Sequence, residues 1–258
     1  MIGLTAGLIA LATGTYADTL LDLVHRRYPE IVSAQIAVTR RDNQPLVVER
    51  HWTGPSKRTD KRILLDASGD EIGTVSVNSA CAVITNADEI ARMLSRRIYS
   101  PSSLAEPDPY VAGAIRAPNA QAIIDDALER DPTIITLAFH VTPPGRTLNA
   151  IVASNFGRIG KVADSDDDKV VRNGETLREV TNAGKRVAVE LPLLDSDHNI
   201  IGALSTSFKV TPGTPEGAAE VRAVALRNEL SRRTPTIRAL FQRNTVSRQV
   251  AAVGTCSS

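Results

Sequence analysis

The sequence predicts an α+β protein of two tandem units, each an antiparallel sheet with flanking helices. Three observations predict this class. A hairpin motif occurs twice in the 258-residue chain. The strand-like segments follow one another with short turns, which favours antiparallel pairing with helices on one face. Hydrophobic residues make up 42% of the chain and aromatic residues only 3%, so two cores of Ala, Val, Ile and Leu are expected.

The repeated motif is a pair of strands joined by a polar turn. The first copy runs from Leu64 to Ser76 and the second from Leu193 to Ser205. Each reads Leu-Leu-Asp, then turn-forming residues, then Ile-Gly and a final serine at the same spacing. The Ile-Gly pair begins the second strand, where glycine permits a close approach of the neighbouring backbone. A Pro-led strand precedes each copy and a helix ending in Leu-Ser-Arg-Arg follows it, which indicates an internal duplication.

The first unit is expected over residues 18–100. Its opening helix ends before Pro29, because proline disfavours helix at the residue preceding it. Its closing helix carries Arg96 and Arg97 in the last turn, where positive charge stabilises the helix dipole. The expected elements of this unit are a helix at 18–28, strands at 31–39, 46–52, 62–66 and 72–77, and a helix at 88–98.

The second unit is expected over residues 119–243, after a proline-rich linker at 101–118 and before a flexible tail at 244–258. Corresponding segments of the two units are further apart in sequence after the second strand than before it. The second unit therefore holds an insertion, at roughly 156–184. The insertion holds a glycine-rich turn and a short helix starting near Ser165. The expected elements are a helix at 120–130, strands at 133–141, 148–154, 186–194 and 200–210, and a helix at 216–232.

The N-terminal residues 1–17 are typical of a signal peptide. The run from Ile2 to Ala12 is uncharged and too short to cross a bilayer, and Thr15-Tyr16-Ala17 offers small residues before a cleavage at Asp18. No lysine or arginine precedes the run, which departs from the usual pattern, and a buried N-terminal helix is the alternative. We therefore predict a periplasmic or secreted protein with no stable membrane span.

Charge and cysteine content exclude several classes of partner. Lys and Arg number 30 against 29 for Asp and Glu, so no electrostatic attraction to nucleic acid is expected. The cysteines, Cys81 and Cys256, form neither a metal motif nor a disulfide framework. The favoured interpretation is a buried Cys81 and an unpaired thiol in the tail, with a single disulfide as the alternative.

Motifs in the second unit resemble the Cache-type sensor domains, extracellular relatives of the PAS fold. The resemblance is specific from Pro132 to Val210, and the first unit shares only the hairpin motif. It implies a small metabolite bound between the sheet and the inserted segment, with a separate receptor or a homodimer as further partners. The residues that carry it are Ala153-Ser154-Asn155, Ile159-Gly160-Lys161, Asp164, Asp167, Gly174, Pro192-Leu193, Asp195, Ile200-Ile201-Gly202 and Ser205.

The candidate ligand-binding residues follow from this placement. The Arg and Lys side chains supply donors to a small polar or anionic ligand, Ser154 and Asn155 could orient it, and His140 lies on a strand where alternate residues face the ligand side. The full set is His140, Ser154, Asn155, Arg158, Lys161, Asp164, Asp167 and Arg172.

No enzyme, metal or cofactor is predicted. Ser154 does not lie in a Gly-x-Ser-x-Gly elbow. The acidic run from Asp164 to Asp168 lacks the glycine of a calcium loop and is followed by Lys169. The alternative to a small-molecule sensor is a non-catalytic interaction or scaffold module whose pocket is not used; an exported hydrolase ranks third.

Overall fold

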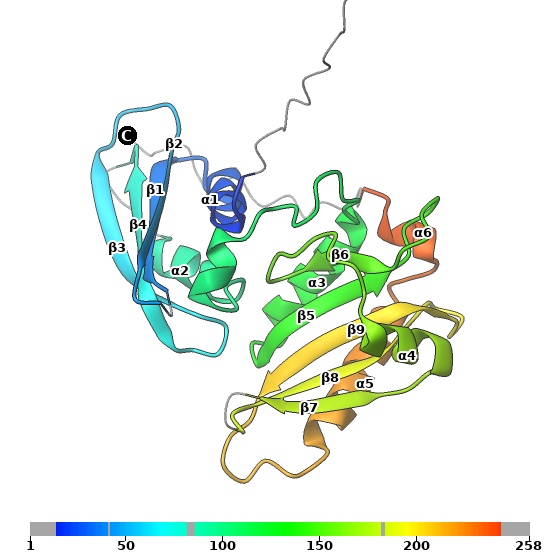
Figure 1. Ribbon diagram of the computed structural model, residues 1–258. Helices are drawn as coiled ribbons and strands as arrows, with labels where there is room; N and C mark the ends of the chain where they lie inside the picture. Colours follow the sequence, from blue (N-terminus) through cyan, green and yellow to red (C-terminus); the bar gives the residue numbers. More distant parts are fainter. Residues whose placement is uncertain (1–13, 41, 82–85, 182–183, 244–258) are drawn as a thin grey trace, which may run out of the picture.

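The computed structural model describes residues 14–40, 42–81, 86–181 and 184–243. It contains two antiparallel sheets, each with helices against one face (Figure 1). This confirms the predicted α+β class with two sheet-and-helix units. Within the described residues, no helix combines the length and apolar character needed to span a bilayer.

The first unit is a four-stranded sheet in the order β2-β1-β4-β3. Helices α1 and α2 pack against one of its faces and bury Leu20, Leu21, Ile90 and Leu94 against the strands. The elements are α1 (Tyr16–Arg27), β1 (Ile31–Thr39), β2 (Pro45–His51), β3 (Arg58–Leu65), β4 (Glu71–Ser79) and α2 (Ala87–Ser95), followed by the 3-10 helix η1 (Pro101–Ala105).

The second unit is a five-stranded sheet in the order β6-β5-β9-β8-β7. Helices α3 and α5 cover one face, and α4 lies against β9 and β8 on the other face (Figure 1). The elements are α3 (Pro118–Arg130), β5 (Ile134–Val141), β6 (Ala150–Ser154), α4 (Ser165–Asn173), β7 (Leu177–Thr181), β8 (Arg186–Leu194), β9 (Ile200–Lys209), α5 (Ala218–Ser231) and α6 (Ile237–Leu240).

The strand orders of the two sheets correspond once the edge strand β7 is set aside. β1, β2, β3 and β4 take the places of β5, β6, β8 and β9. Gly73 and Gly202 lie at matching points: a Cβ would come within 2.1 Å of the Ala37 carbonyl oxygen in one unit and 2.2 Å of the His140 carbonyl oxygen in the other. Glycine is required at both places because a side chain would force the strands apart.

Helix α1 begins two residues earlier than the sequence predicted. Thr15 caps it, and Asp18 completes a reciprocal capping box. Tyr16 and Ala17 are buried in the core of the first unit, so these two residues belong to the folded domain. Residues 1–13 of the predicted signal peptide, and the tail beyond residue 243, lie outside the described residues.

Two further differences concern the insertion and the cysteines. The helix predicted near Ser165 is present as α4, but β7 was not predicted; it adds an edge strand to the second sheet. Cys81 is disulfide-bonded rather than a free thiol, and Cys256 lies outside the described residues.

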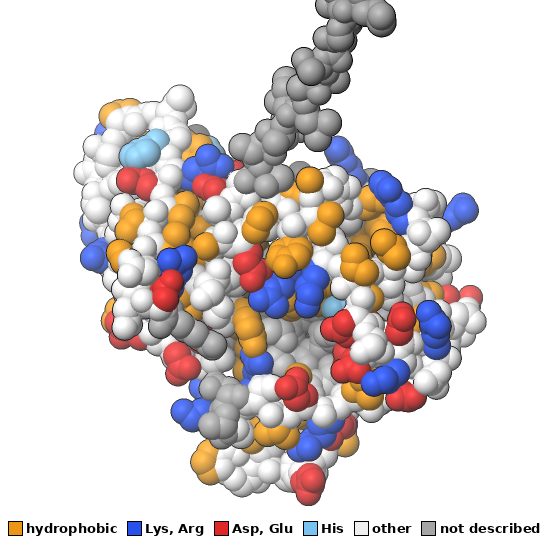
Figure 2. Space-filling view, viewed as in Figure 1, with side chains coloured by type: hydrophobic (Ala, Val, Ile, Leu, Met, Phe, Trp, Pro, Cys, Tyr) orange, Lys and Arg blue, Asp and Glu red, His pale blue; other side chains and the backbone are white. Residues whose placement is uncertain are grey.

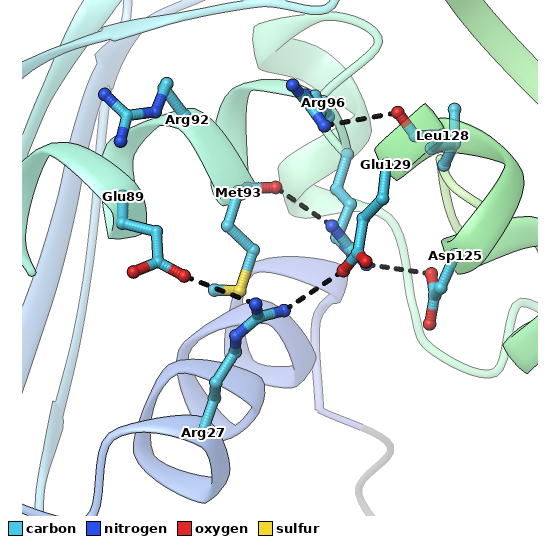
Figure 3. A pocket seen from close by; sticks show the side chains of 9 residues that line it. Arg27, Glu89, Arg92, Met93, Arg96, Asp125, Leu128 and Glu129 are labelled. Atoms are coloured by element: carbon cyan, nitrogen blue, oxygen red, sulfur yellow. Dashed lines mark hydrogen bonds and ion pairs between the residues drawn. The ribbon is translucent and has the colours of Figure 1, made fainter. Parts of the chain in front are cut away.

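The two units meet through a polar interface. Figure 3 shows Arg27 of α1 between Glu89 of α2 and Glu129 of α3, at 3.3 and 3.5 Å. Beside it, the Arg97 guanidinium donates to Asp125 at 2.8 Å. A cavity of about 200 Å³ lies among these side chains. Arg27 and Arg97 are paired with carboxylates from the facing helices, so we interpret the cavity as part of the interface between units.

Candidate functional site

The open face of the second sheet carries a row of polar and small side chains. Alternate strand residues point to opposite faces, and Leu137, Phe139 and Val141 face the helices. The residues between them, Thr136, Ala138 and His140, therefore face the other way. Their register partners on this face are Ser205 and Ser207 of β9 and, one strand further, Ala188 and Glu190 of β8.

The segment after Ser154 folds back over this face, as the sequence predicted. The Gly160 amide donates to the Ile151 carbonyl at 2.8 Å, and the Ile151 amide donates to the Lys161 carbonyl at 3.0 Å. Ile159 packs with Ala138 and Ile151 in a small apolar cluster. The loop is therefore held by backbone pairing with β6 and by burial of one aliphatic side chain.

A cavity of about 180 Å³ lies between the loop and the sheet, and we call it the sheet pocket. In Figure 2 the surface on this side is hollowed over the second sheet, with Lys and Arg side chains on one side of the hollow and Asp and Glu side chains on the other. The pocket is smaller than the roughly 300–1,000 Å³ sites that enclose drug-sized ligands, which fits a small metabolite. Its lining residues are Tyr99, Thr136, Phe156, Arg158, Arg186, Ala188 and Ser207.

The two arginines of the sheet pocket differ in their partners. Arg158 donates from Nε and Nη2 to the two carboxylate oxygens of Glu106, at 2.9 Å each, and this pairing raises the pKa of Arg158. Arg186 donates to the Thr181 hydroxyl at 2.8 Å and lies over the Tyr99 ring, 4.6 Å from its centroid. Among the described residues no carboxylate pairs with Arg186, so its charge is available to an anionic ligand.

Arg158 has an unusual backbone conformation. Its φ is +62°, in the left-handed region that a residue with a Cβ seldom adopts. Such a conformation costs roughly 1–2 kcal/mol and persists only where surrounding contacts enforce it. The bidentate pair with Glu106 supplies such a contact and fixes the guanidinium at the rim of the sheet pocket.

A second polar group lies further along the same face. The His140 Nδ1 and Asp167 Oδ1 atoms are 2.7 Å apart. One imidazole nitrogen of His140 and one carboxylate oxygen each of Asp167 and Glu190 lie within 4.8 Å of one another. Burial, together with the neighbouring Asp167, raises the pKa of Glu190 to about 9. Burial opposes ionisation of Asp167 too, but its contacts with His140 and Glu190 lower its pKa well below the ordinary value.

Ser154 and Asn155 have structural roles. The Ser154 hydroxyl donates to the Gly157 carbonyl inside the turn. The Asn155 side chain, only 1% exposed, accepts from the Leu137 amide at 2.8 Å and donates to the Arg96 and Ile135 carbonyls at 2.7 and 2.9 Å. Neither side chain lines the sheet pocket, but Asn155 ties the loop to the first unit.

The remaining predicted residues lie around α4 and the loop. Asp164 is the N-cap of α4 and accepts from the Asp166 and Asp167 amides. Lys161 is exposed and joins β6 through its backbone. The Arg172 side chain is 75% exposed and pairs with Asp168. The structure therefore brings His140 and Asp167 together and places Arg158 at the sheet pocket, whereas Lys161 and Arg172 point elsewhere.

Sequence reasoning missed Glu190, Arg186 and Tyr99. A signal for the first two is present: Arg186-Val187-Ala188-Val189-Glu190 alternates apolar residues with charged or small ones, which places Arg186 and Glu190 on the face opposite the core. Tyr99 follows the closing helix of the first unit. No local pattern indicates that this residue reaches the second sheet.

A larger cavity, of about 450 Å³, lies on the outer side of β6. Its walls are mainly aliphatic and small residues from 111–115 and 147–152, with Arg146 as the charged lining residue. A specific site needs a few polar groups that converge on the ligand. The sheet pocket has such groups, so it is the stronger candidate.

Comparisons with known proteins give no family assignment. No family model matches the chain, and no curated protein matches it. One similar solved structure is a GAF sensor protein from Burkholderia vietnamiensis, 14% identical, covering 61% of this chain and 94% of that chain, with a TM-score of 0.35.

Two other solved structures are more distant in TM-score. The inducer-binding domain of the PobR transcription factor from Acinetobacter, in complex with 3-hydroxybenzoic acid, is 13% identical, covers 43% of this chain and 95% of its own, and has a TM-score of 0.28. PelD from Pseudomonas aeruginosa PAO1 is 12% identical, covers 87% of this chain and 79% of its own, and has a TM-score of 0.24. These scores are low, so the function has to be argued from the site itself.

Proposed function

We propose that this protein binds a small anionic metabolite in the sheet pocket and acts as a sensor-like binding protein without turnover. One observation carries the proposal: Arg186 lines a hollow of the second sheet, and no carboxylate of the described chain pairs with it. A guanidinium in this setting is suited to bidentate binding of a carboxylate or phosphate.

The rest of the sheet pocket fits the body of such a ligand. The Thr136 and Ser207 hydroxyls lie 2.6 Å apart on the pocket floor and can donate or accept hydrogen bonds. Tyr99 and Phe156, with ring centroids 6.3 Å apart, provide apolar walls. The ligand we expect is a small carboxylate with one apolar portion and one or two hydroxyl or amino groups.

The first unit takes part in this site. Tyr99 reaches the pocket from the end of the first unit, and the Asn155 amide binds the Arg96 carbonyl beside it. The repeated hairpin motif and the matching strand orders support an origin by duplication, in which the second copy gained the insertion at roughly 156–184. Binding would then alter the contact between the units, which is a route for a signal to a partner.

Replacing Arg186 with glutamine tests this function. In a thermal-shift screen of small carboxylates, a ligand of the native state raises the melting temperature. We expect Arg186→Gln to weaken binding of a hit roughly 10–100-fold, because hydrogen bonds to a charged partner contribute about 1.5–3 kcal/mol. The matched control is Arg178→Gln, since Arg178 lies on neighbouring β7 and pairs with Glu220 of α5 at 2.8 Å.

Equal affinity in the Arg186 and Arg178 variants would place the ligand elsewhere. A screen in which no carboxylate or phosphate shifts the wild-type melting temperature would favour the alternative, an interaction module. The exposed apolar residues Val47 and Ile63, each 58% exposed on the first sheet, are the surface that such a module would use.

Export remains part of the proposal, with a different cleavage point. Cleavage after Ala17 would remove Tyr16, whose buried hydroxyl lies 2.9 Å from the Arg97 carbonyl and 3.0 Å from the Asn155 carbonyl, so that it can donate to either. The sequence Ala10-Leu11-Ala12 offers small residues at the two positions that signal peptidase reads. Cleavage there leaves the folded unit intact.

N-terminal mass spectrometry of the protein isolated from the periplasm or medium tests this proposal. We expect a mature chain starting at Thr13. A mature chain starting at Asp18, or uncleaved protein retained in the cytoplasm, would contradict it. Replacing Ala12 with a bulky residue should block processing, and the same substitution at Ala17 should leave the start at Thr13.

A further inference from the structure

The cluster of His140, Asp167 and Glu190 has the composition of a metal site. The three residues come from β5, α4 and β8, and each offers a donor atom within 4.8 Å of the other two. They are separate from the residues that line the sheet pocket, although both groups lie on the open face of the second sheet. The sequence predicted no metal here because the donors belong to three distant segments.

Unpartnered buried atoms point into this cluster. His140 is 8% exposed and Asp167 is 4% exposed. Within the described part of the chain, Nε2 of His140 and Oε1 of Glu190 are buried without a hydrogen bond, and Nδ1 of His140 and Oδ1 of Asp167 contact each other. Most buried polar side-chain atoms have a partner, and an exception requires an explanation such as an ion. We propose that this cluster binds one divalent transition-metal ion, with Zn²⁺ as the probe.

The donor set selects the type of ion. An imidazole favours zinc and other late transition metals over calcium or magnesium, which take oxygen ligands. Two carboxylates balance the charge of a divalent ion. Zinc binds nitrogen and oxygen at about 2.0–2.2 Å, so the His140 and Asp167 donor atoms, now 2.7 Å apart, must separate slightly as the ion replaces their direct contact.

The capping box of α4 orients one ligand. The second carboxylate oxygen of Asp167, Oδ2, accepts from the Asp164 amide at 2.9 Å, and the Asp164 side chain accepts from the Asp167 amide in return. This arrangement leaves Oδ1 directed at His140. Asp164 is therefore a positioning residue, of the kind that fixes a metal ligand from outside the coordination sphere.

Three protein ligands leave a coordination position open, as in zinc sites that bind water or a small molecule. The Glu190 ligand and the pocket residue Ala188 lie two positions apart on the same face of β8. The bound ion would therefore lie at one end of the sheet pocket and would connect α4 to the sheet. Helix α4 and the sheet would then be joined through the metal ligands in addition to packing.

Zinc titration of the chelator-treated full chain tests the proposal. We expect one Zn²⁺ per chain by isothermal titration and elemental analysis, and a higher melting temperature with zinc present. His140→Gln and Glu190→Gln should each weaken zinc binding by more than the roughly 10–100-fold that loss of an outer partner costs. The matched control is Asp166→Asn, an exposed acid on the same helix paired with Lys169 at 2.8 Å, which should bind zinc as wild type does.

Two further measurements make the result decisive. Circular dichroism of each variant establishes that its fold is intact, and the absorption spectrum of the Co²⁺-loaded protein should change in the His140 variant but not in the Asp166 variant. Arg186→Gln should retain full zinc affinity, so failure of the small-molecule proposal is distinguishable from failure of this one. Absence of stoichiometric zinc binding, or equal affinity in all variants, would overturn the metal site.

Discussion

Replacement of Asn155 with alanine is expected to lower the free energy of unfolding by about 3–5 kcal/mol. The Asn155 side chain makes three hydrogen bonds to backbone groups, of which those to Leu137 and Ile135 are buried. Each buried group left without a partner costs about 1–3 kcal/mol. Urea unfolding followed by circular dichroism measures the change.

The control for this substitution is Asn173→Ala. Asn173 is exposed at the end of α4, and its amide donates to Glu175 at 2.7 Å, so a change within about 0.5 kcal/mol is expected. Asn155→Asp should be as damaging as the alanine variant, because a carboxylate would face the Arg96 and Ile135 carbonyls. A loss below about 1 kcal/mol for both Asn155 variants would mean that water replaces the amide.

The position of Asn155 explains why it is unsuitable for testing ligand binding. Its side chain connects β5, the turn that follows β6 and the end of the first unit's closing helix. Tyr16 reaches the same turn from α1 and packs against Gly157, where a Cβ would lie 2.9 Å from the Tyr16 ring. A variant at Asn155 would loosen the interface and the pocket together, whereas Arg186 can be changed with little effect on the core.

The repeated hairpin motif was enough to predict two units that each combine an antiparallel sheet with helices. Strand alternation and turn residues are local properties of the sequence. The pairs Ile72-Gly73 and Ile201-Gly202 therefore located the strands β4 and β9. The helix at Ser165 was predictable for the same reason, because a capping residue and the acids of its first turn act within one turn. The edge strand β7 was not predicted. Leu177–Thr181 lies at the sheet edge and pairs with β8, a contact that its own short segment does not indicate.

The candidate site was predictable only in part. His140 and Asp167 were selected separately, and their 2.7 Å contact depends on the packing of α4 over the sheet. The alternation of β8 places the third member, Glu190, on the open face of the sheet, but nothing in its own segment indicates that it meets His140 and Asp167. Contacts between segments far apart in the chain are set by tertiary packing, and a single sequence carries little information about them.

Replacement of Gly202 with alanine should cost about 3 kcal/mol, near the upper end of the effects seen when atoms are added to a packed site. The added Cβ would lie 2.2 Å from the His140 carbonyl oxygen and 2.6 Å from a Val141 methyl carbon. The first of these is backbone, so β5 and β9 have to separate, and they are neighbouring strands of the second sheet. Because His140 lies at the contact, zinc affinity should fall together with stability.

The equivalent substitution in the first unit extends this test to the relation between the units. Gly73→Ala meets the Ala37 carbonyl oxygen at 2.1 Å and also requires a φ of +153°, so it should destabilise the protein at least as strongly, without an effect on zinc. Gly14→Ala is the control, since its nearest neighbour would lie at 3.4 Å, and it should change stability by less than about 0.5 kcal/mol. If Gly202→Ala were as stable as this control, the strands would have to adjust freely at that point. The matched close contacts would then lose their force as evidence that the two units share one architecture.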